Sequence, residues 1–345
     1  MTAYWFLFGL FGFGAMIESG RSPATRSPRL LYLLCALLVI MLVGLRHEVG
    51  ADWWNYKAMF SATGRSDLDR ALQLGDPGYQ AINWGVYQLG RGIYLVNLIC
   101  ASVFAWGLFR FAGTQPRPWL ALLVAVPYMI VVVAMGYTRQ AVALGVLMAG
   151  LASFIRGGSI LRFAAFVAVA ALFHRTAIVA FPLVALASER NRFVNFLITI
   201  AASFMLYDVF LSEELSGFVE RYIEREYSSQ GAAVRIAMNM VAALAFWLAH
   251  KRMEFSERER LLWRNFSIAA AVLAVLLLVL PSSTAVDRMA LYVLPMQVAV
   301  LARMPLAVGQ FTGKVAIAGY LLLVQFVWLN FAQYASYWVP YRWVL

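Results

Sequence analysis

Four positions in the sequence place a cationic or imidazole side chain at the edge of a long apolar run. They are Arg46–His47, Arg139, His174–Arg175 and Asp287–Arg288. A charge at membrane depth is costly and by default marks a functional site. The alternative is that each arginine reaches up to lipid headgroups along its aliphatic stem. Because a guanidinium binds phosphate oxygens through several donors, four such positions on one face favour an anion site, and a diphosphate over a single carboxylate.

Two side chains are candidates for taking a proton in such a site. His174 lies where two apolar runs meet, and the charge of Arg175 beside it should lower its pKa and leave a neutral imidazole that accepts a proton. The alternative interpretation of His174 is a packing residue. Asp52 either pairs with Arg46 or acts as general base for a sugar hydroxyl. His47 is a weaker candidate for the role of His174.

Composition decides which elements must carry these residues. Of 345 residues, 63% are hydrophobic and 13% are charged, against roughly 45–50% and about 25% in soluble domains. Lipid must therefore be part of the solvent, and we expect a single transmembrane domain over 1–345. The net charge of +11 is dispersed between apolar runs, which argues against a nucleic-acid-binding patch. Both cysteines lie inside apolar runs and predict neither a disulfide nor a metal site.

The sequence predicts an all-α polytopic membrane protein. Because a span takes about 20 apolar residues, we expect about twelve transmembrane helices, within a range of roughly ten to thirteen. The predicted spans are Ala3–Met16, Leu30–Leu45, Gly92–Ala112, Trp119–Met135, Arg139–Ile155, Arg162–Phe173, Thr176–Ala187, Phe193–Tyr207, Ala232–Ala249, Phe266–Leu280, Met289–Ala302 and Val315–Tyr334. The first lacks a basic n-region and a cleavage site, so we interpret it as a retained helix rather than a signal peptide.

Lysine and arginine counts orient these helices. Alternate connections, beginning with the one after the first helix, hold sixteen basic and five acidic residues, whereas the opposite connections hold twelve of each. The positive-inside rule then places the first set in the cytoplasm and both termini in the periplasm. The long outer connections cover about 46–91 and 208–231. The first contains the turn signal Gly75–Gly78, and the second has the spacing of an interfacial helix.

Motifs of several other classes are missing from the sequence. It has no Gly-Lys-Ser/Thr P-loop, no G-x-S-x-G and no H-E-x-x-H. Acidic residues stay at the edges of the spans, which argues against a proton-coupled pump. Asp67-Leu-Asp69 has the form of a metal-binding D-x-D, but its Ser, Arg and Gly neighbours indicate a hydrated loop. We therefore predict no cofactor and no metal.

The segment Gly44-Leu-Arg-His-Glu-Val-Gly-Ala-Asp-Trp-Trp-Asn-Tyr56 carries the most specific resemblance. It resembles the G-x-R-x-x-x-G-x-D-x-x-x-Y motif of the EpsG family, bacterial exopolysaccharide proteins related to the Wzy polysaccharide polymerases. Ala51 departs from the small hydroxylated residue usual there. Weaker similarities follow in the family's order over nearly the whole chain, at Gly78–Tyr79, Arg139, Phe173–His174, Thr176, Pro182, Arg221–Tyr222, Asp287–Arg288 and Tyr292.

The resemblance implies a polymerase with a GT-C-like helical arrangement. Its substrates would be undecaprenyl-diphosphate-linked glycans, and its working face would be the periplasmic side of the bacterial inner membrane. The growing chain would move from its lipid diphosphate onto a new lipid-linked repeat unit, with inversion and without a metal. Membrane lipids are expected partners, and a chain-length regulator is an open alternative. A glycan ligase, a single-sugar GT-C glycosyltransferase and a lipid-linked oligosaccharide transporter are the rival functions.

The resemblance also implies roles for the residues singled out above. His174, or failing that Asp52, would take the proton from the acceptor hydroxyl. Trp53, Trp54 and Tyr56 are candidate stacking platforms for sugars. The residues expected to bind the diphosphate and its sugars are Arg46, Arg139, Arg175, Arg288, His47, Tyr56, Tyr292 and Arg221.

Overall fold

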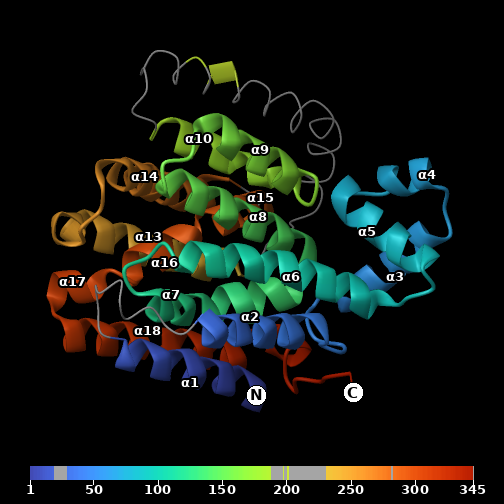
Figure 1. The fold of residues 1–345 in the computed structure, drawn as a ribbon, viewed down its shortest axis with the longest axis horizontal. Helices are drawn as coiled ribbons and strands as arrows, with labels where there is room; N and C mark the ends of the chain where they lie inside the picture. Colours follow the sequence, from blue (N-terminus) through green and yellow to red (C-terminus); the bar gives the residue numbers. More distant parts are fainter. Residues whose placement is uncertain (19–28, 188–196, 198–199, 202–230, 281–282, 345) are drawn as a thin grey trace.

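A computed structural model describes residues 1–18, 29–187, 197, 200–201, 231–280 and 283–344. Its long helices pack side by side into a bundle (Figure 1). The bounds of the helices are α1 Thr2–Ile17, α2 Arg29–Gly44, α3 Trp53–Gly64, α4 Leu68–Gln73, α5 Pro77–Gln88, α6 Ile93–Ala112, α7 Pro118–Ala125, η2 Val126–Ala134, α8 Thr138–Ile155, α9 Ile160–Ala171, η3 Arg175–Val179, α10 Ala180–Ala185, α13 Ala232–Ala249, η4 His250–Arg252, α14 Glu257–Val279, α15 Ser283–Ala290, η5 Leu291–Val293, α16 Pro295–Leu301, α17 Met304–Val308, α18 Gln310–Phe331 and η6 Ala335–Tyr337.

The chain is a helical membrane protein, but the predicted count of twelve spans is not reproduced. In the described part, five helices are long and apolar enough to cross a membrane, or up to six if one bent pair is a single span. That pair, Ser283–Val293 and Pro295–Val308, bends by 44°. Five further apolar helices reach only 10–17 residues. The predicted span Phe193–Tyr207 falls almost entirely outside the described residues, and nothing in the structure fixes the side on which the termini lie.

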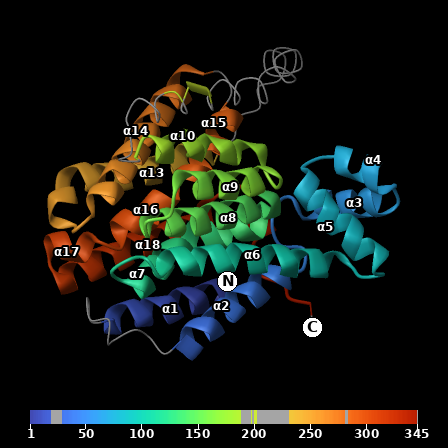
Figure 2. The same cartoon turned by 45° about the horizontal axis from the view of Figure 1, so that its top comes forward.

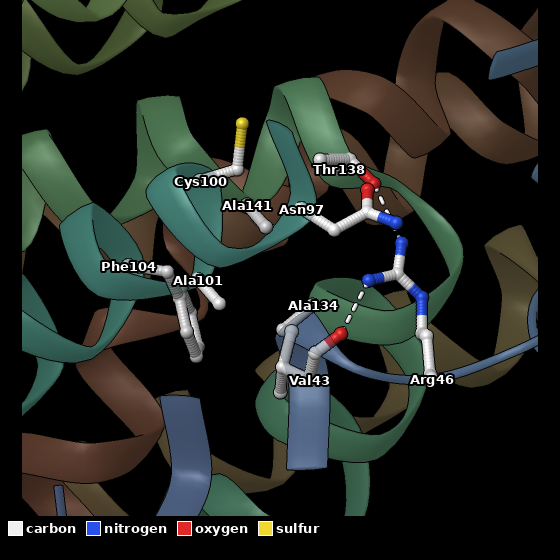
Figure 3. Close-up of a pocket in the computed structure, with 9 residues that line it drawn as sticks. All are labelled: Val43, Arg46, Asn97, Cys100, Ala101, Phe104, Ala134, Thr138 and Ala141. Atoms are coloured by element: carbon white, nitrogen blue, oxygen red, sulfur yellow. Dashed lines mark hydrogen bonds between the residues drawn. The ribbon is translucent and has the colours of Figure 1, made fainter. Parts of the chain in front are cut away.

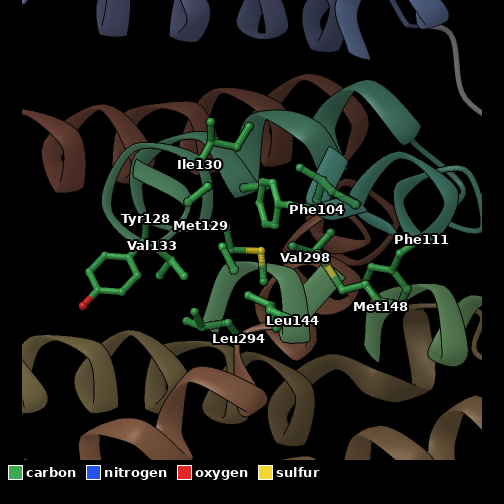
Figure 4. Close-up of a cluster of buried hydrophobic side chains, with 14 of the residues drawn as sticks. Phe104, Phe111, Tyr128, Met129, Ile130, Val133, Leu144, Met148, Leu294 and Val298 are labelled. Atoms are coloured by element: carbon green, nitrogen blue, oxygen red, sulfur yellow. The ribbon is translucent and has the colours of Figure 1, made fainter. Parts of the chain in front are cut away.

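The core of the bundle is built around α8, whose apolar window is 83% buried. Figure 4 shows its centre, where Phe104 of α6, Met129 of η2, Leu144 of α8 and Val298 of α16 meet. The axes of α6 and α8 come close because Gly107 faces Gly145, so that a Cβ atom on either glycine would collide with the other helix. Small residues permit such backbone approach where lipid supplies no hydrophobic drive.

The connection 46–91, predicted as a long outer loop, is a lobe of three helices. In Figures 1 and 2, α3, α4 and α5 stand at one end of the bundle, whereas α17 and the connection between α13 and α14 lie at the opposite end. The lobe has a hydrogen-bonded interior: the buried Gln80 side chain accepts from Thr63 at 2.8 Å and from Asn83 at 3.1 Å.

The opposite end contains a buried ion pair that composition alone did not indicate. Arg303 lies 2.5 Å from Glu259 and stacks over Phe255 at 4.4 Å. Glu259 also forms a capping box with Ser256, which starts α14 at Glu257 rather than at the predicted Phe266. Arg303, counted above among the residues facing the cytoplasm, is therefore a structural cation inside the bundle, 4% exposed.

Candidate active site

Two glycines, Gly44 and Gly50, determine the path of the loop between α2 and α3. Gly50 has a φ of 101°, a left-handed value that favours glycine, and a Cβ atom there would collide with the Met135 carbonyl. Gly44, at the end of α2, lies so close to α6 that an added Cβ atom would be 2.9 Å from the Cα of Leu98. These two glycines explain the first two glycine positions of the G-x-R-x-x-x-G-x-D motif: Gly44 brings the end of α2 against α6, and Gly50 brings the loop, two residues before Asp52, against the segment that precedes α8.

Arg46 corrects the expectation that every motif arginine meets the ligand. It is 1% exposed, and its guanidinium donates to the Val43 carbonyl at 2.5 Å, the Val49 carbonyl at 3.3 Å and the Thr138 hydroxyl at 2.7 Å. The space that it lines (Figure 3) is too small to admit even a water molecule. Arg46 therefore fixes the loop onto α8, and its predicted contact with the diphosphate stays a prediction.

A carboxylate that the sequence analysis passed over lies at the centre of the site. Asp76 precedes α5, and it pairs with Arg139 of α8 at 2.6 Å. Burial raises the pKa of the Asp76 carboxyl, whereas Arg139, Arg175 and Arg288 lower it. The charges of three of the four predicted arginines therefore act on this one carboxylate, and Arg139 contacts it directly. The Gly75–Gly78 segment had been interpreted only as a turn, although an aspartate directly before a helix-starting proline was a visible signal.

Asp52 belongs to the same cluster. It precedes α3 without capping it, and among the described residues its side chain has one hydrogen bond, a long one of 3.4 Å from Asn55. Burial raises the pKa of Asp52, and the charges of Arg139 and Arg288 oppose the rise. A carboxylate with so weak a hydrogen-bond partner, facing two arginines, is able to accept a proton from an incoming hydroxyl.

His174 is held by three polar neighbours. Its Nδ1 lies 2.6 Å from the Thr176 hydroxyl and 3.0 Å from the Tyr292 hydroxyl, and its Nε2 lies 3.2 Å from the Gln140 amide nitrogen. Burial lowers the pKa of His174 to about 3, with further contributions from Arg288 and Arg139. This shift favours the neutral form of the imidazole. The cause differs from the prediction, because burial and two arginines distant in sequence act in place of Arg175.

Arg235 is a buried cation that the sequence analysis missed. Its side chain is 3% exposed and pairs with Asp287 at 2.8 Å, while its Nε donates to the Tyr128 hydroxyl at 2.9 Å. It also donates to the Asp287 carbonyl at 3.0 Å. These contacts tie α13 to α15 and thereby place Arg288, the next residue along α15. The signal was an arginine inside the predicted span Ala232–Ala249, a position that by default needs a functional reason.

Other predicted residues lie at the margin of this cluster or outside the description. His47 contacts the Tyr94 hydroxyl at 2.6 Å and Glu48 at 3.8 Å, and its ring faces Trp53 and Tyr94. Trp53 and Tyr56 are 4% and 5% exposed, which corrects their expected role as stacking platforms; Trp54 is 57% exposed. Tyr56 instead hydrogen-bonds with Arg139. Arg221 lies outside the described residues.

The assembled cluster has two chemical capacities. Its arginines, Arg139, Arg175 and Arg288, offer forks of donors to a polyanion. Asp52 offers a proton acceptor beside them. In the part of the chain that the structure describes, no group of three or more His, Cys, Asp or Glu side chains is placed to hold a metal ion.

Comparison with known proteins gave one match. The family model for the EpsG family matches residues 29–343, which is nearly the whole chain. Comparison with curated proteins and with solved structures found no match. The GT-C-like arrangement of the helices therefore stays a prediction.

Proposed function

The chain belongs to the EpsG family, and from that premise we propose that it polymerises undecaprenyl-diphosphate-linked repeat units at the periplasmic face of the bacterial inner membrane. Membership in the family supports a polysaccharide polymerase-type role in general. The observation that carries the finer proposal is the Arg139–Asp76 pair at 2.6 Å, together with the charges of Arg175 and Arg288 that act on Asp76 and those of Arg139 and Arg288 that act on Asp52. A diphosphate leaving group and an activated hydroxyl need these two kinds of side chain.

The three arginines act on the leaving group. As the bond between the anomeric carbon and the diphosphate oxygen breaks, the electron pair stays on that oxygen, and negative charge grows there. Prearranged guanidinium groups stabilise such charge more in the transition state than in the bound substrate. Asp76 holds Arg139 in place at 2.6 Å before the substrate arrives, so that little reorientation is needed during the reaction.

Asp52 takes the proton. The acceptor hydroxyl attacks the anomeric carbon from the side opposite the diphosphate, which inverts the configuration, and its proton passes to the Asp52 carboxylate. His174 is the less suitable base, because a group with a pKa of about 3 binds protons weakly and both its ring nitrogens are already engaged. We assign His174 to holding Tyr292 and Gln140 in position.

The periplasmic placement rests on charge. The connections predicted to face the cytoplasm carry an excess of eleven basic residues, and those on the other side are neutral. The α3–α5 lobe, which contains Asp52 and Asp76, belongs to the neutral side. The two rival enzymes would keep the cluster but use a different acceptor. A transporter would need a polar path open to both sides, and the gathering of the candidate residues at one side favours an enzyme.

The test is synthesis from one pure substrate. We expect the protein, purified into lipid nanodiscs and supplied with a single lipid-diphosphate-linked repeat unit, to produce a ladder of chain lengths. Asp52→Asn protein in the same nanodiscs is the control for contaminating activity. Transfer to an unrelated acceptor without a ladder would indicate a ligase, and addition of one sugar would indicate a single-sugar transferase. Movement of intact substrate across a vesicle membrane would indicate a transporter. Any of these three outcomes would overturn the proposal.

A further inference from the structure

Residues 332–344, here called the strap, follow α18 and cross the end of the bundle where the site lies. In Figures 1 and 2 the chain leaves α18 and ends near the end of α2. The strap pairs with the loop after α2, and Arg46 and Trp343 form an isolated antiparallel bridge. The backbone hydrogen bonds run from the amides of His47, Val344 and Gly50 to the carbonyls of Arg342, Leu45 and Tyr337, at 3.0, 3.1 and 2.9 Å.

One side chain of the strap enters the core. Trp338 is fully buried, and its indole N–H donates to the Val131 carbonyl of η2 at 2.7 Å. Its ring lies against Gly136, where an added Cβ atom would be 2.5 Å from the Trp338 Cζ2. The backbone carbonyl of Trp338 accepts a hydrogen bond from the Tyr4 hydroxyl at 2.7 Å. Trp338 therefore fixes the short segment that joins η2 to α8.

The two contacts of the strap meet at one place. Gly50, held by the Tyr337 carbonyl, packs on the segment held by Trp338: a Cβ atom on Gly50 would be 3.0 Å from the Gly136 Cα. Asp52 follows Gly50 by two residues, and Arg139 follows Gly136 by three. The strap thus contacts both backbone segments that carry these side chains: the loop that leads to Asp52 and the segment that leads to Arg139.

We propose that the strap is a positioning element of the active site, in which Trp338 and the Tyr337 carbonyl set the separation of Asp52 and Arg139. The inference rests on the proposed function, since it assumes that Asp52 and Arg139 act on the same substrate. Its physical basis is that the loop carrying Asp52 has a left-handed glycine at its turning point. Such a loop has many conformations open to it unless a partner restrains it.

A pair of substitutions tests the proposal. Gly136→Ala places a methyl group against the indole and should displace the ring. Trp338→Phe removes the atoms that the methyl group meets and also the N–H donor. We expect Gly136→Ala to lower the transfer rate at least tenfold, Trp338→Phe to lower it a few-fold, and the double variant to recover several-fold over Gly136→Ala. Gly319→Ala is the matched control, because nothing lies within 4 Å of the added atom.

A pH profile separates positioning from mere support of the fold. Asp52 must be deprotonated to act, so its titration sets the acid limb of kcat/KM in the wild-type protein. If the arginines move away from Asp52, the limb moves to higher pH. Loss of folded protein would lower the rate equally at every pH. The charged groups that act on Asp52 are Arg139 on α8 and Arg288 on α15. The titratable hydroxyls of Tyr56 on α3 and Tyr137 beside α8 also interact with Asp52, but burial raises the pKa of both and they stay uncharged throughout the acid limb.

The outcomes distinguish failure of the inference from failure of the proposed function. An acid limb in the wild-type protein that moves in both single variants, with rescue in the double variant, supports the strap's role. A wild-type limb that stays in place in both variants overturns it. If Asp52→Asn keeps the wild-type rate and acid limb, the proposed base is wrong, whatever the strap variants do. If Gly136→Ala fails to reach the membrane, Trp338→Phe alone decides: an unmoved limb overturns the inference.

Discussion

Asp52→Asn is the substitution that should lower the rate of catalysis most while changing the stability of the fold least. Three aspartates, Asp52, Asp67 and Asp76, stand directly before the helices of the α3–α5 lobe, and none of them caps its helix through its side chain. Replacing Asp52 by the amide of equal size therefore removes no capping bond. We expect the free energy of unfolding to change by no more than about 0.5 kcal/mol, as for ordinary partly exposed positions.

The expected effect on catalysis is much larger. A positioned general base contributes roughly 10²–10⁴-fold to a rate, which corresponds to about 2.7–5.4 kcal/mol of activation free energy. KM for the lipid-linked substrate should change little, because Asp52 acts on the hydroxyl rather than on the diphosphate. Asp67→Asn is the matched control, since Asp67 is exposed and stands before α4 in the same lobe. It should retain the wild-type rate.

The assay is the initial rate of chain extension in nanodiscs, measured across pH. Burial raises the pKa of Asp52, so the wild-type rate should fall on acidification through a pKa above the ordinary value of about 3.9. The sign follows from the role, since the base works only when deprotonated. An Asp52→Asn rate within threefold of wild type, together with a hundredfold loss in His174→Ala, would refute the reasoning and make His174 the base.

Three further substitutions address the cations. Arg139→Lys replaces a planar guanidinium by a point charge and should lower the extension rate by about tenfold or more. Arg65→Lys, at an exposed position of the lobe, should leave the rate unchanged, and equal extension rates in the two variants would indicate that Arg139 does not bind the diphosphate. Arg46→Met removes the donor from three buried acceptors and should destabilise the protein by about 3 kcal/mol or more. The thermal unfolding midpoint in detergent should therefore fall, and an unchanged midpoint would contradict the structural role of Arg46. Arg235→Met removes one partner of the buried ion pair with Asp287 and should cost about 3–5 kcal/mol. Adding Asp287→Asn should restore most of the midpoint but not the rate, and full recovery of the rate would show that Arg288 does not depend on this pair.

The positions of the helices were predictable because apolar runs leave little choice in lipid. Runs such as 93–112 and 139–155 coincide with α6 and α8 almost residue for residue. The count of spans failed because several runs fold into short or bent helices, as at Ile160–Ala171 and at the 44° bend after Val293. Whether a short apolar helix crosses the membrane depends on its neighbours, and no single run of sequence contains that information.

The candidate site was predictable in kind but not in detail. The arginines at the edges of apolar runs predict an anion site, and the charges of Arg139, Arg175 and Arg288 all act on one carboxylate; binding of an anion there stays a prediction. Arg46 has the same sequence signature, yet its donors are occupied by the Val43 and Val49 carbonyls and the Thr138 hydroxyl. Asp76 lies 63 residues before its partner, so only the fold could reveal their pairing.

The contact between residues 45–50 and residues 337–344 also sets an order of assembly in the membrane. The loop emerges from the ribosome soon after α2, but the carbonyl groups that its amides need belong to residues synthesised after α18. Until α18 is inserted, the amides of His47 and Gly50 lack these carbonyl partners, and Trp338 cannot occupy its buried position against Gly136. We therefore expect the proposed site to be completed only after α18 has entered the bilayer.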